Sequence, residues 1–138
     1  MTAVAGYGEV QESHPHALQG HEGGFPELRW VDVCPAARLL PERGVAALVD
    51  GAQVAIFLTH DGALYGLDNL DPFSGAAVLS RGIVGDRAGA PTVASPVFKQ
   101  AFDLRDGRCL DDPDVSVATR PVRIADGTVQ VGIPCPAP

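Results

Sequence analysis

Four histidines are the first side chains in this sequence that could bind a metal ion or move a proton. His14, His16 and His21 lie near the N-terminus, and H-x-H spacing can chelate a metal. Because the surrounding sequence has no hydrophobic pattern that would build a scaffold, we interpret them as solvated residues on a disordered arm. His60 lies beside an Asp-Gly turn signal, so we expect a surface turn residue there, with a general base as the alternative.

Nucleophiles and paired carboxylates offer no clearer catalytic site. Ser74 and Ser95 have no histidine near them in sequence, so an activated serine is unsupported unless the fold supplies a base. No phosphate-binding loop, nucleophile elbow or dinucleotide-binding glycine motif occurs. Five aspartates crowd one turn-rich stretch, and we interpret them as a solvated acidic rim: Asp103, Asp106, Asp111, Asp112 and Asp114. The sequence therefore shows no catalytic constellation.

The three cysteines give no sign of a disulfide framework or of a structural zinc site. Cys34, Cys109 and Cys135 are odd in number, far apart and free of C-x-x-C pairing, so we expect reduced thiols. Cys109 falls in a predicted strand and should be buried, whereas Cys135 near the C-terminus should be exposed.

Short apolar runs separated by turn residues indicate an all-β protein. The chain has 138 residues, the size of one domain, with 46% hydrophobic and 20% charged residues, which is globular composition. Asp-Gly, which favours tight hairpins, occurs four times, starting at positions 50, 61, 106 and 126. Strands are predicted over 29–33, 45–49, 53–58, 63–67, 101–104, 108–110, 117–124 and 128–133, with a short helical piece over 35–40. We expect a β-sandwich or small barrel of short antiparallel strands.

Composition and charge also bound the location and partners of the protein. Residues 1–28 predict a disordered N-terminal tail, residues 29–133 the folded domain, and residues 134–138 a C-terminal tail. The net charge of −7 argues against nucleic acid and anionic membranes as partners. No apolar stretch approaches the roughly 18 residues of a membrane-spanning helix, and no secretory signal pattern opens the chain, so we expect a soluble, cytoplasmic protein.

Two long connections interrupt the series of predicted hairpins. They cover residues 68–86 (DNLDPFSGAAVLSRGIVGD) and residues 94–99 (ASPVFK). Loops of this length inside a compact β domain are uncommon unless they bind something or face a partner. The function should therefore be located in these two loops.

The order of these loops resembles that of the Rieske iron-sulfur domain. Each loop contains a proline turn, and the second is followed by F-D-L-x-x-G-x-C-L. In that family the first loop carries Cys-x-His and the second Cys-x-x-His, and these four residues bind a [2Fe-2S] cluster. The resemblance places the ligand positions at Asp71, Phe73, Ser95 and Phe98, so all four ligands are replaced.

These replacements imply a Rieske-like domain without a cluster. Phenylalanine has no lone pair for iron, and a serine hydroxyl does not replace a soft thiolate. We expect Phe73 and Phe98 to fill the volume of the lost cluster and to pack against each other across the loop tips. Ordinary core positions are the alternative for both residues, and each interpretation predicts burial.

Two longer strings narrow the resemblance. D-P-F-S-G and L-S-R-G-I-V-G-D, within residues 30–133, resemble the small subunits of assimilatory NAD(P)H-dependent nitrite reductases. This likeness implies a cytoplasmic, non-catalytic accessory subunit of nitrate assimilation that carries no cofactor of its own. Its larger partner would carry FAD, a [4Fe-4S] cluster and sirohaem, and would reduce nitrite to ammonium with electrons from NADH or NADPH.

Such a subunit would act through binding, and its candidate contact surface is formed by the loop tips, residues 71–75 and 95–98. The predicted interface residues are Pro72, Ser74, Gly75, Arg81, Arg87 and Lys99. The basic ones could pair with partner carboxylates, with solvated surface charge as the alternative for each. Two other functions stay open: a Rieske-type electron carrier, and a stand-alone β-barrel module that binds a small molecule or a protein.

Overall fold

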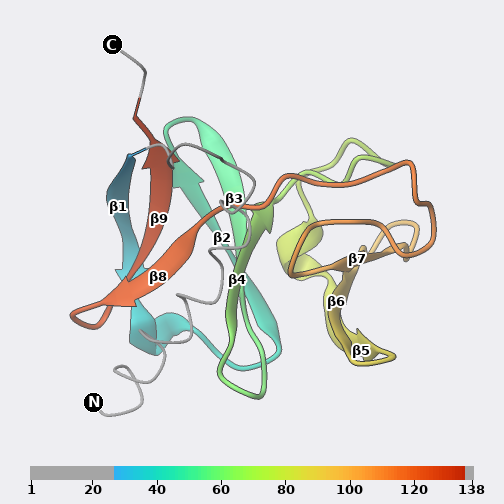
Figure 1. Cartoon of the computed structure of the whole chain (residues 1–138), viewed down its shortest axis with the longest axis horizontal. Helices are drawn as coiled ribbons and strands as arrows, with labels where there is room; N and C mark the ends of the chain where they lie inside the picture. The colour runs from blue at the N-terminus through green and yellow to red at the C-terminus, as the bar shows by residue number, and fades with distance from the viewer. Residues whose placement is uncertain (1–26, 136–138) are drawn as a thin grey trace.

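The computed structural model describes residues 27–135, and this part of the chain is built mainly of strands and irregular connections (Figure 1). The strands are β1 (Leu28–Pro35), β2 (Arg43–Val49), β3 (Ala52–Leu58), β4 (Leu64–Asp68), β5 (Ile83–Arg87), β6 (Ala90–Ala94), β7 (Ala101–Asp103), β8 (Val122–Ala125) and β9 (Thr128–Pro134). Two 3₁₀ helices accompany them, η2 (Ala36–Arg38) and η3 (Leu79–Arg81). Within residues 27–135, no helix is long and apolar enough to cross a membrane.

The predicted tails lie almost wholly outside the described residues. Residues 1–26, which include His14, His16 and His21, and residues 136–138 are not described. β1 begins at Leu28 and β9 ends at Pro134, one residue outside the predicted domain bounds at each end. Residues 28 and 134 belong to strands because they pair with each other across β1 and β9.

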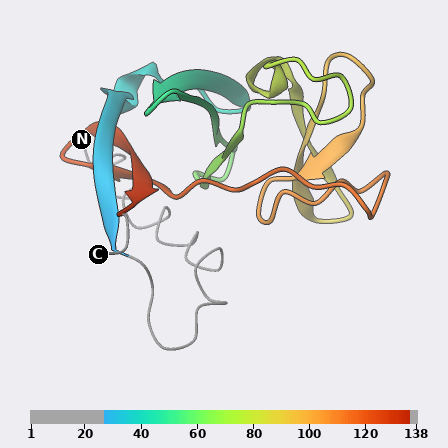
Figure 2. The same ribbon diagram turned by 90° about the horizontal axis from the view of Figure 1, so that it is seen from above.

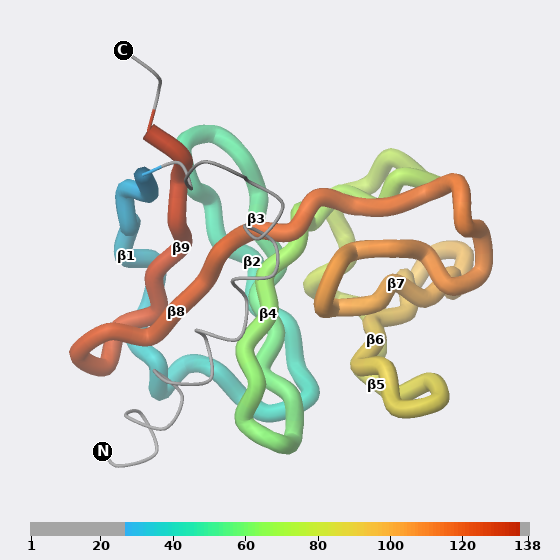
Figure 3. The backbone as a smooth tube through the Cα atoms, in the orientation of Figure 1, coloured from blue at the N-terminus to red at the C-terminus, as the bar shows by residue number. Residues whose placement is uncertain are grey.

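The strands form three antiparallel sheets of three strands each, in the orders β1-β9-β8, β2-β3-β4 and β5-β6-β7. The first two sheets pack on each other in one half of the molecule, and the third sheet with its loops forms the other half (Figures 1 and 2). The third sheet is inserted between β4 and β8, and the chain returns to β8 through an irregular segment, residues 104–121 (Figure 3). The expected all-β fold is confirmed.

Strand β3 lies between two hydrophobic cores, which explains why it is apolar at every position from Val54 to Leu58. Val54, Ile56 and Leu58 belong to the core between the two larger sheets. Ala55 and Phe57 point to the other face and join the core of the third sheet. Successive strand side chains alternate between faces, so a strand covered on both sides must be apolar at every position. β3 therefore connects the two halves of the domain.

The predicted Asp-Gly hairpins are confirmed as two-residue turns at two of the four sites. Asp61-Gly62 lies in a longer turn between β3 and β4, and Asp106-Gly107 is followed only by isolated bridges. Asp50 and Gly51 join β2 to β3 with φ of 50° and 81°, and Asp126 and Gly127 join β8 to β9 with φ of 51° and 77°. Positive φ at both central residues defines the turn that matches the twist of a two-residue hairpin. These dipeptides set the register of the two larger sheets.

The first long connection is more structured than predicted. Residues 68–86 include the helix η3 and most of strand β5, and β6 follows directly, so reading this stretch as one loop was wrong. All β5 residues except Val84 are exposed, so the strand has no alternating apolar pattern to signal it. It is held instead by pairing with β6 across a turn at Ala88 and Gly89.

Three other element predictions need correction. Residues 108–110 and 117–121 do not form regular strands and make only isolated bridges, such as Phe102 with Cys109 and Leu67 with Thr119. The helical piece predicted over 35–40 is the single 3₁₀ turn η2, closed by the Leu39 N–H donating to the Ala36 carbonyl. In each case the local sequence is compatible with a regular element, but tertiary contacts hold the backbone in an irregular conformation.

Gly66 allows the returning segment to lie directly against β4. A Cβ at this position would come within 2.6 Å of the Arg120 carbonyl oxygen. The Arg120 N–H donates to the Gly66 carbonyl at 2.8 Å, and its guanidinium pairs with Asp68 at 2.7 Å. These contacts fix the start of the first candidate loop to the larger half of the domain.

Candidate functional site

The two candidate loops share one backbone geometry. In residues 71–75 the Gly75 N–H donates to the Asp71 carbonyl at 2.8 Å, and in residues 95–99 the Lys99 N–H donates to the Ser95 carbonyl at 2.9 Å. Gly75 and Lys99 both have positive φ, of 76° and 65°. Proline follows the first residue in each loop, where its fixed φ favours a turn. The two loops are therefore equivalent turns on adjoining segments.

A hydrogen bond joins the first residues of the two turns. Ser95 Oγ donates to Asp71 Oδ2 at 2.6 Å, and both side chains are fully buried. Asp71 also accepts the Phe73 N–H at 2.9 Å and the Ser74 hydroxyl at 3.0 Å. Asp71 and Ser95 are two of the predicted ligand positions, so the fold brings them together and bonds them to each other.

These hydrogen bonds keep Asp71 ionised. Burial raises the pKa of Asp71, but the hydrogen bonds from Ser95, Phe73 and Ser74 outweigh burial and hold that pKa below its usual value. Ser95 consequently faces a carboxylate with no solvent access, and no histidine contacts it among the described residues. The arrangement supports a structural pair and not an activated serine.

The predicted contact between Phe73 and Phe98 is wrong. Phe73 is partly buried and its ring lies 6.1 Å from the ring of Phe102, a core residue of β7. Phe98 is 58% exposed at the tip of the second loop. The Asp71–Ser95 hydrogen bond, which does not depend on an aromatic pair, holds the loops together. The shared expectation of burial therefore fails for Phe98.

The residues at the four ligand positions do not fit an iron-sulfur cluster. Phe73 and Phe98 offer no lone pair, and the oxygens of Asp71 and Ser95 are already engaged with each other. Among residues 27–135 there is also no group of three or more His, Cys, Asp or Glu side chains that could hold a metal ion. The donor set thus disagrees with the chemistry of a Rieske centre.

The predicted acidic rim is only partly solvent-exposed. Asp103 is buried and receives three hydrogen bonds from Arg105, from its N–H at 2.8 Å and from its guanidinium at 3.1 and 2.9 Å. Burial raises the pKa of Asp103, and these bonds outweigh it and lower the pKa overall. Asp111, at the surface, accepts the Ala101 N–H and pairs with Arg87 at 2.9 Å. Asp103 was predicted to be solvent-exposed, and this prediction was wrong. The fold buries its side chain, and Arg105 satisfies its carboxylate.

Several single-residue expectations are confirmed. His60 is an exposed turn residue whose N–H donates to Glu42 at 2.9 Å. Cys109 is buried, Cys135 is exposed, and no disulfide forms among the three cysteines.

The predicted interface residues lie at or near the loops, and they differ in exposure and in whether they are already paired with another side chain. Pro72, Gly75, Arg81, Arg87 and Lys99 are exposed, and Ser74 is half-buried because it bonds to Asp71. Arg87 is occupied by Asp111, whereas Arg81 and Lys99 make no ion pair with a described residue. Unpaired cations on a chain with net charge −7 are available to a partner.

Exposed apolar side chains at the same end of the molecule were not anticipated as binding groups. Val97 is 44% and Phe98 58% exposed in the second loop, and Ile83, whose strand neighbour is Ala94, is 73% exposed. The apolar residues inside a predicted loop were the available signal, since a solvated loop has little reason to carry them. Exposed apolar groups beside free cations are typical of a protein-binding surface.

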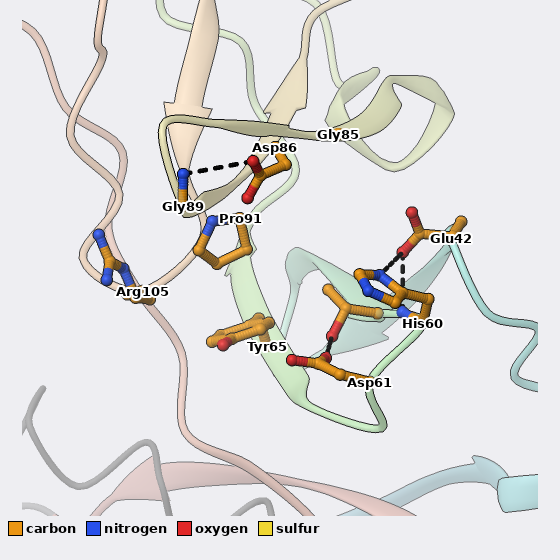
Figure 4. A pocket seen from close by; sticks show the side chains of 10 residues that line it. Glu42, His60, Asp61, Tyr65, Gly85, Asp86, Gly89, Pro91 and Arg105 are labelled. Carbon is orange, nitrogen blue, oxygen red and sulfur yellow. Dashed lines mark hydrogen bonds and ion pairs between the residues drawn. The ribbon is translucent and has the colours of Figure 1, made fainter.

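A polar cavity of about 300 Å³ lies on another side of the third sheet. Figure 4 shows it between the β5–β6 hairpin, with Asp86 and Gly89, and the β3–β4 turn, with His60 and Asp61. A hydrogen bond from Thr59 lowers the pKa of Asp61, which keeps this carboxylate charged. Sequence reasoning missed the cavity because its walls come from segments far apart in the chain.

Comparison with known proteins identifies the family. A model of the Rieske-like [2Fe-2S] domain matches residues 29–132. The nitrite reductase (NADH) small subunit of Escherichia coli is 43% identical over 104 residues, which cover 75% of this chain and 96% of that protein. The chain belongs to the Rieske-like family, among the nitrite reductase small subunits.

Two further relatives support this assignment. A crystal structure from Mycobacterium tuberculosis, described as a candidate NADH-dependent nitrite reductase small subunit, is 51% identical with a TM-score of 0.76 and covers 80% of this chain and 99% of that one. The nitrite reductase [NAD(P)H] large subunit of Klebsiella oxytoca is 42% identical over 118 residues, which are 86% of this chain but 12% of that protein. A Rieske-like segment of this kind therefore also occurs inside a large-subunit chain.

Proposed function

We propose that this chain is the non-catalytic small subunit of a cytoplasmic NAD(P)H-dependent nitrite reductase of nitrate assimilation. It binds the large subunit, which carries FAD, a [4Fe-4S] cluster and sirohaem and reduces nitrite to ammonium. The observation that carries the proposal is the Asp71–Ser95 hydrogen bond at two former ligand positions, in a member of the nitrite reductase small-subunit group. A domain in which the residues at two ligand positions bond to each other can bind a partner through its surface, but it cannot carry electrons on a cluster.

The Klebsiella oxytoca relative supports a close association with the large subunit. In that protein a segment 42% identical to this chain is part of the large-subunit polypeptide. Segments that are fused in one protein and separate in another commonly work side by side. We therefore infer that this chain docks on the large subunit as the fused segment does within its own chain.

The contact surface in this proposal is formed by the two loop tips. Pro72 and Gly75 in the first tip and Phe98 in the second are exposed, as are Lys99, which follows the second tip, and Arg81 on η3. Phe98 supplies an apolar anchor, and the unpaired cations provide attraction to partner carboxylates. Aromatic anchors surrounded by charge are the usual centre of such interfaces.

Co-elution and absorption together test this function. The purified chain is expected to be colourless and to co-elute with the large subunit of the same nitrite reductase. Arg81→Glu should weaken co-elution, and Arg38→Glu, which changes another exposed and unpaired arginine on η2, should not. Stoichiometric iron with acid-labile sulfide would overturn the absence of a cluster, and failure to bind the large subunit would overturn the accessory role.

A further inference from the structure

Strand β5 leaves one edge of the third sheet open. Among the described residues the sheet order is β5-β6-β7, so β5 pairs only with β6. Its residues other than Val84 are exposed. Open edges present unpaired backbone N–H and C=O groups, and these can pair with another extended chain.

The hairpin geometry shows which backbone groups face outward. Ala88 and Gly89 form a two-residue turn, so the flanking residues Arg87 and Ala90 make the closing hydrogen-bonded pair. Bonded and non-bonded pairs then alternate, which leaves Asp86 and Val84 pointing away from β6. Pro91, the neighbour of Asp86, has no N–H to give, and its carbonyl accepts from Leu104 at 2.9 Å on the other side. The outward direction of the Pro91 carbonyl agrees with Asp86 and Pro91 being a pair without hydrogen bonds between them.

The outward edge of β5 adjoins the polar cavity of about 300 Å³. Gly85, Asp86 and Gly89 form its upper wall in Figure 4, and Tyr65 and Asp61 lie opposite them. Gly85 has no side chain, and a Cβ there would make only an ordinary contact of 3.6 Å. No second heavy atom of the described residues outside its chain neighbours lies within 4 Å of that Cβ, so the space beside Gly85 is open.

The charges around the cavity select the kind of segment. The carboxyl groups of Glu42, Asp61 and Asp86 line it, together with His60, which lies 3.8 Å from Glu42. Its one arginine, Arg105, is bound through its guanidinium to the buried Asp103 and cannot neutralise them all. A basic side chain entering the cavity would meet carboxylates and the Tyr65 ring, which suits an ammonium or guanidinium group.

Two other occupants fit this edge less well. Residues 1–26 of the same chain contain three glutamates and no lysine or arginine. A second copy of the chain would bring its own Asp86 edge and a net charge of −7 to an acidic groove. Both would add like charge, which is unfavourable at close range.

We propose that the open edge of β5 and the adjoining cavity bind an extended basic segment of a partner protein, which pairs with Val84 and Asp86 as an added strand and places a Lys or Arg side chain between Asp61 and Asp86. This recognition mode uses main-chain hydrogen bonds for affinity and side-chain pockets for specificity. The proposal does not depend on the loop-tip interface, since it uses the edge of β5 that faces away from β6 and none of residues 71–75 or 95–98.

The edge geometry has a direct test in the free protein. In amide hydrogen exchange, Val84 and Asp86 should exchange faster than Gly85 and Arg87, because only the latter two donate to β6. Equal protection of the four amides, or the reverse order, would overturn the assignment of the open edge.

Binding can be tested with the peptide acetyl-Lys-Val-Lys-Val-Lys-amide added to the full chain, followed by NMR. We expect shift changes confined to β5 and the cavity residues, with no comparable effect from the peptide carrying glutamate in place of lysine. A peptide methylated at alternate backbone nitrogens should also fail to bind, because it cannot donate to the edge. Shifts at other surfaces, or equal binding of the three peptides, would overturn the proposal.

Variants of the chain separate charge from backbone pairing. Asp86→Asn keeps an acceptor for the Gly89 N–H and should weaken the lysine peptide about tenfold. Asp114→Asn removes the same charge from an exposed site outside the cavity and should leave binding unchanged. Asp86→Pro removes the outward N–H and should abolish binding, with folding checked by the unchanged shifts of β1 and β9. Concentration-dependent dimerisation through β5 would favour a second copy and overturn the basic partner.

Discussion

At the scale of single residues, Asp71 and Ser95 form a buried pair at two predicted ligand positions. Each occupies the first position of its turn, and the turns bring the two side chains within 2.6 Å. The bond joins a buried carboxylate to a hydroxyl, and charge-assisted bonds of this kind are stronger than neutral ones. The Asp71–Ser95 hydrogen bond therefore fixes one loop to the other.

We expect Ser95→Ala to lower the free energy of unfolding by about 1–3 kcal/mol, because it leaves a buried carboxylate with one hydrogen bond fewer. Urea denaturation measures this loss. Ser74→Ala is the matched control, since Ser74 bonds to the same Asp71 oxygen but is half-buried and lies in the same turn. Water can replace its hydroxyl, so its loss should be below about 1 kcal/mol. Equal losses would contradict the special role of the bond between loops.

The stability of the protein should fall in acid because four aspartates have lowered pKa values in the fold: Asp61, Asp71, Asp103 and Asp111. A lowered folded pKa stabilises the protein above the unfolded value of about 4 and is lost as pH falls through the folded value. Urea titrations should show constant stability from about pH 7 to 5 and a decline below about pH 4. In Asp71→Asn this decline should be shallower, and an unchanged slope would exclude Asp71 as a contributor.

Sequence reasoning located the positions of this residue pair but not their bond. The positions follow from the proline turns and the likeness to Rieske loops, which depend on local sequence. The bond depends on the distance between two loops separated by 24 positions, and no local pattern reports that distance. For the same reason, Phe98 was expected to be buried although it lies at an exposed tip.

At the scale of elements, the β5–β6 hairpin has a turn residue that does not suit its conformation. Ala88 has φ of 53°, in the left-handed region where Asn, Asp and Gly are favoured. The other two-residue hairpins use Asp-Gly at the same place. The hairpin forms because Val93 anchors β6 in the core. The conformation of Ala88 slightly destabilises the turn.

We expect Ala88→Asn to raise the free energy of unfolding by about 0.5–1 kcal/mol, since asparagine tolerates the left-handed conformation. Thermal denaturation gives the shift in Tm. The control is Ala90→Gly in β6, where φ is not positive and glycine should destabilise by about 0.5–1 kcal/mol. A loss of stability in Ala88→Asn would show that the turn conformation carries no strain.

At the scale of the whole molecule, the two halves of the domain have different roles. The larger half is closed by two packed sheets and offers a stable base through its core. The smaller half carries both loops and the exposed Phe98, and the cavity beside β5 lies between this half and the β3–β4 turn of the larger one. Its core is joined to the base through Phe57 of β3, so the binding surfaces rest on a rigid element.

We expect Phe98→Ser to weaken binding to the large subunit at least about tenfold, because buried aromatic anchors dominate protein interfaces. Leu48→Ser is the matched control, since Leu48 is 72% exposed on β2 in the larger half. Titration calorimetry of each variant with the large subunit measures the change. Equal weakening by both variants would show that the loop tip has no special part in docking.

The sequence by itself determined the all-β class, the two-residue Asp-Gly turns at positions 50 and 126 and the two proline turns at residues 71–75 and 95–99, because these depend on residue types at short spacing. The tertiary structure alone decided that Asp71 bonds to Ser95, that Asp103 is buried, that Phe98 is exposed, and that β5 has an open edge beside a cavity. These features depend on distances between segments far apart in the chain. Such distances are set by the packing of β3 between two cores and are not encoded in any local pattern.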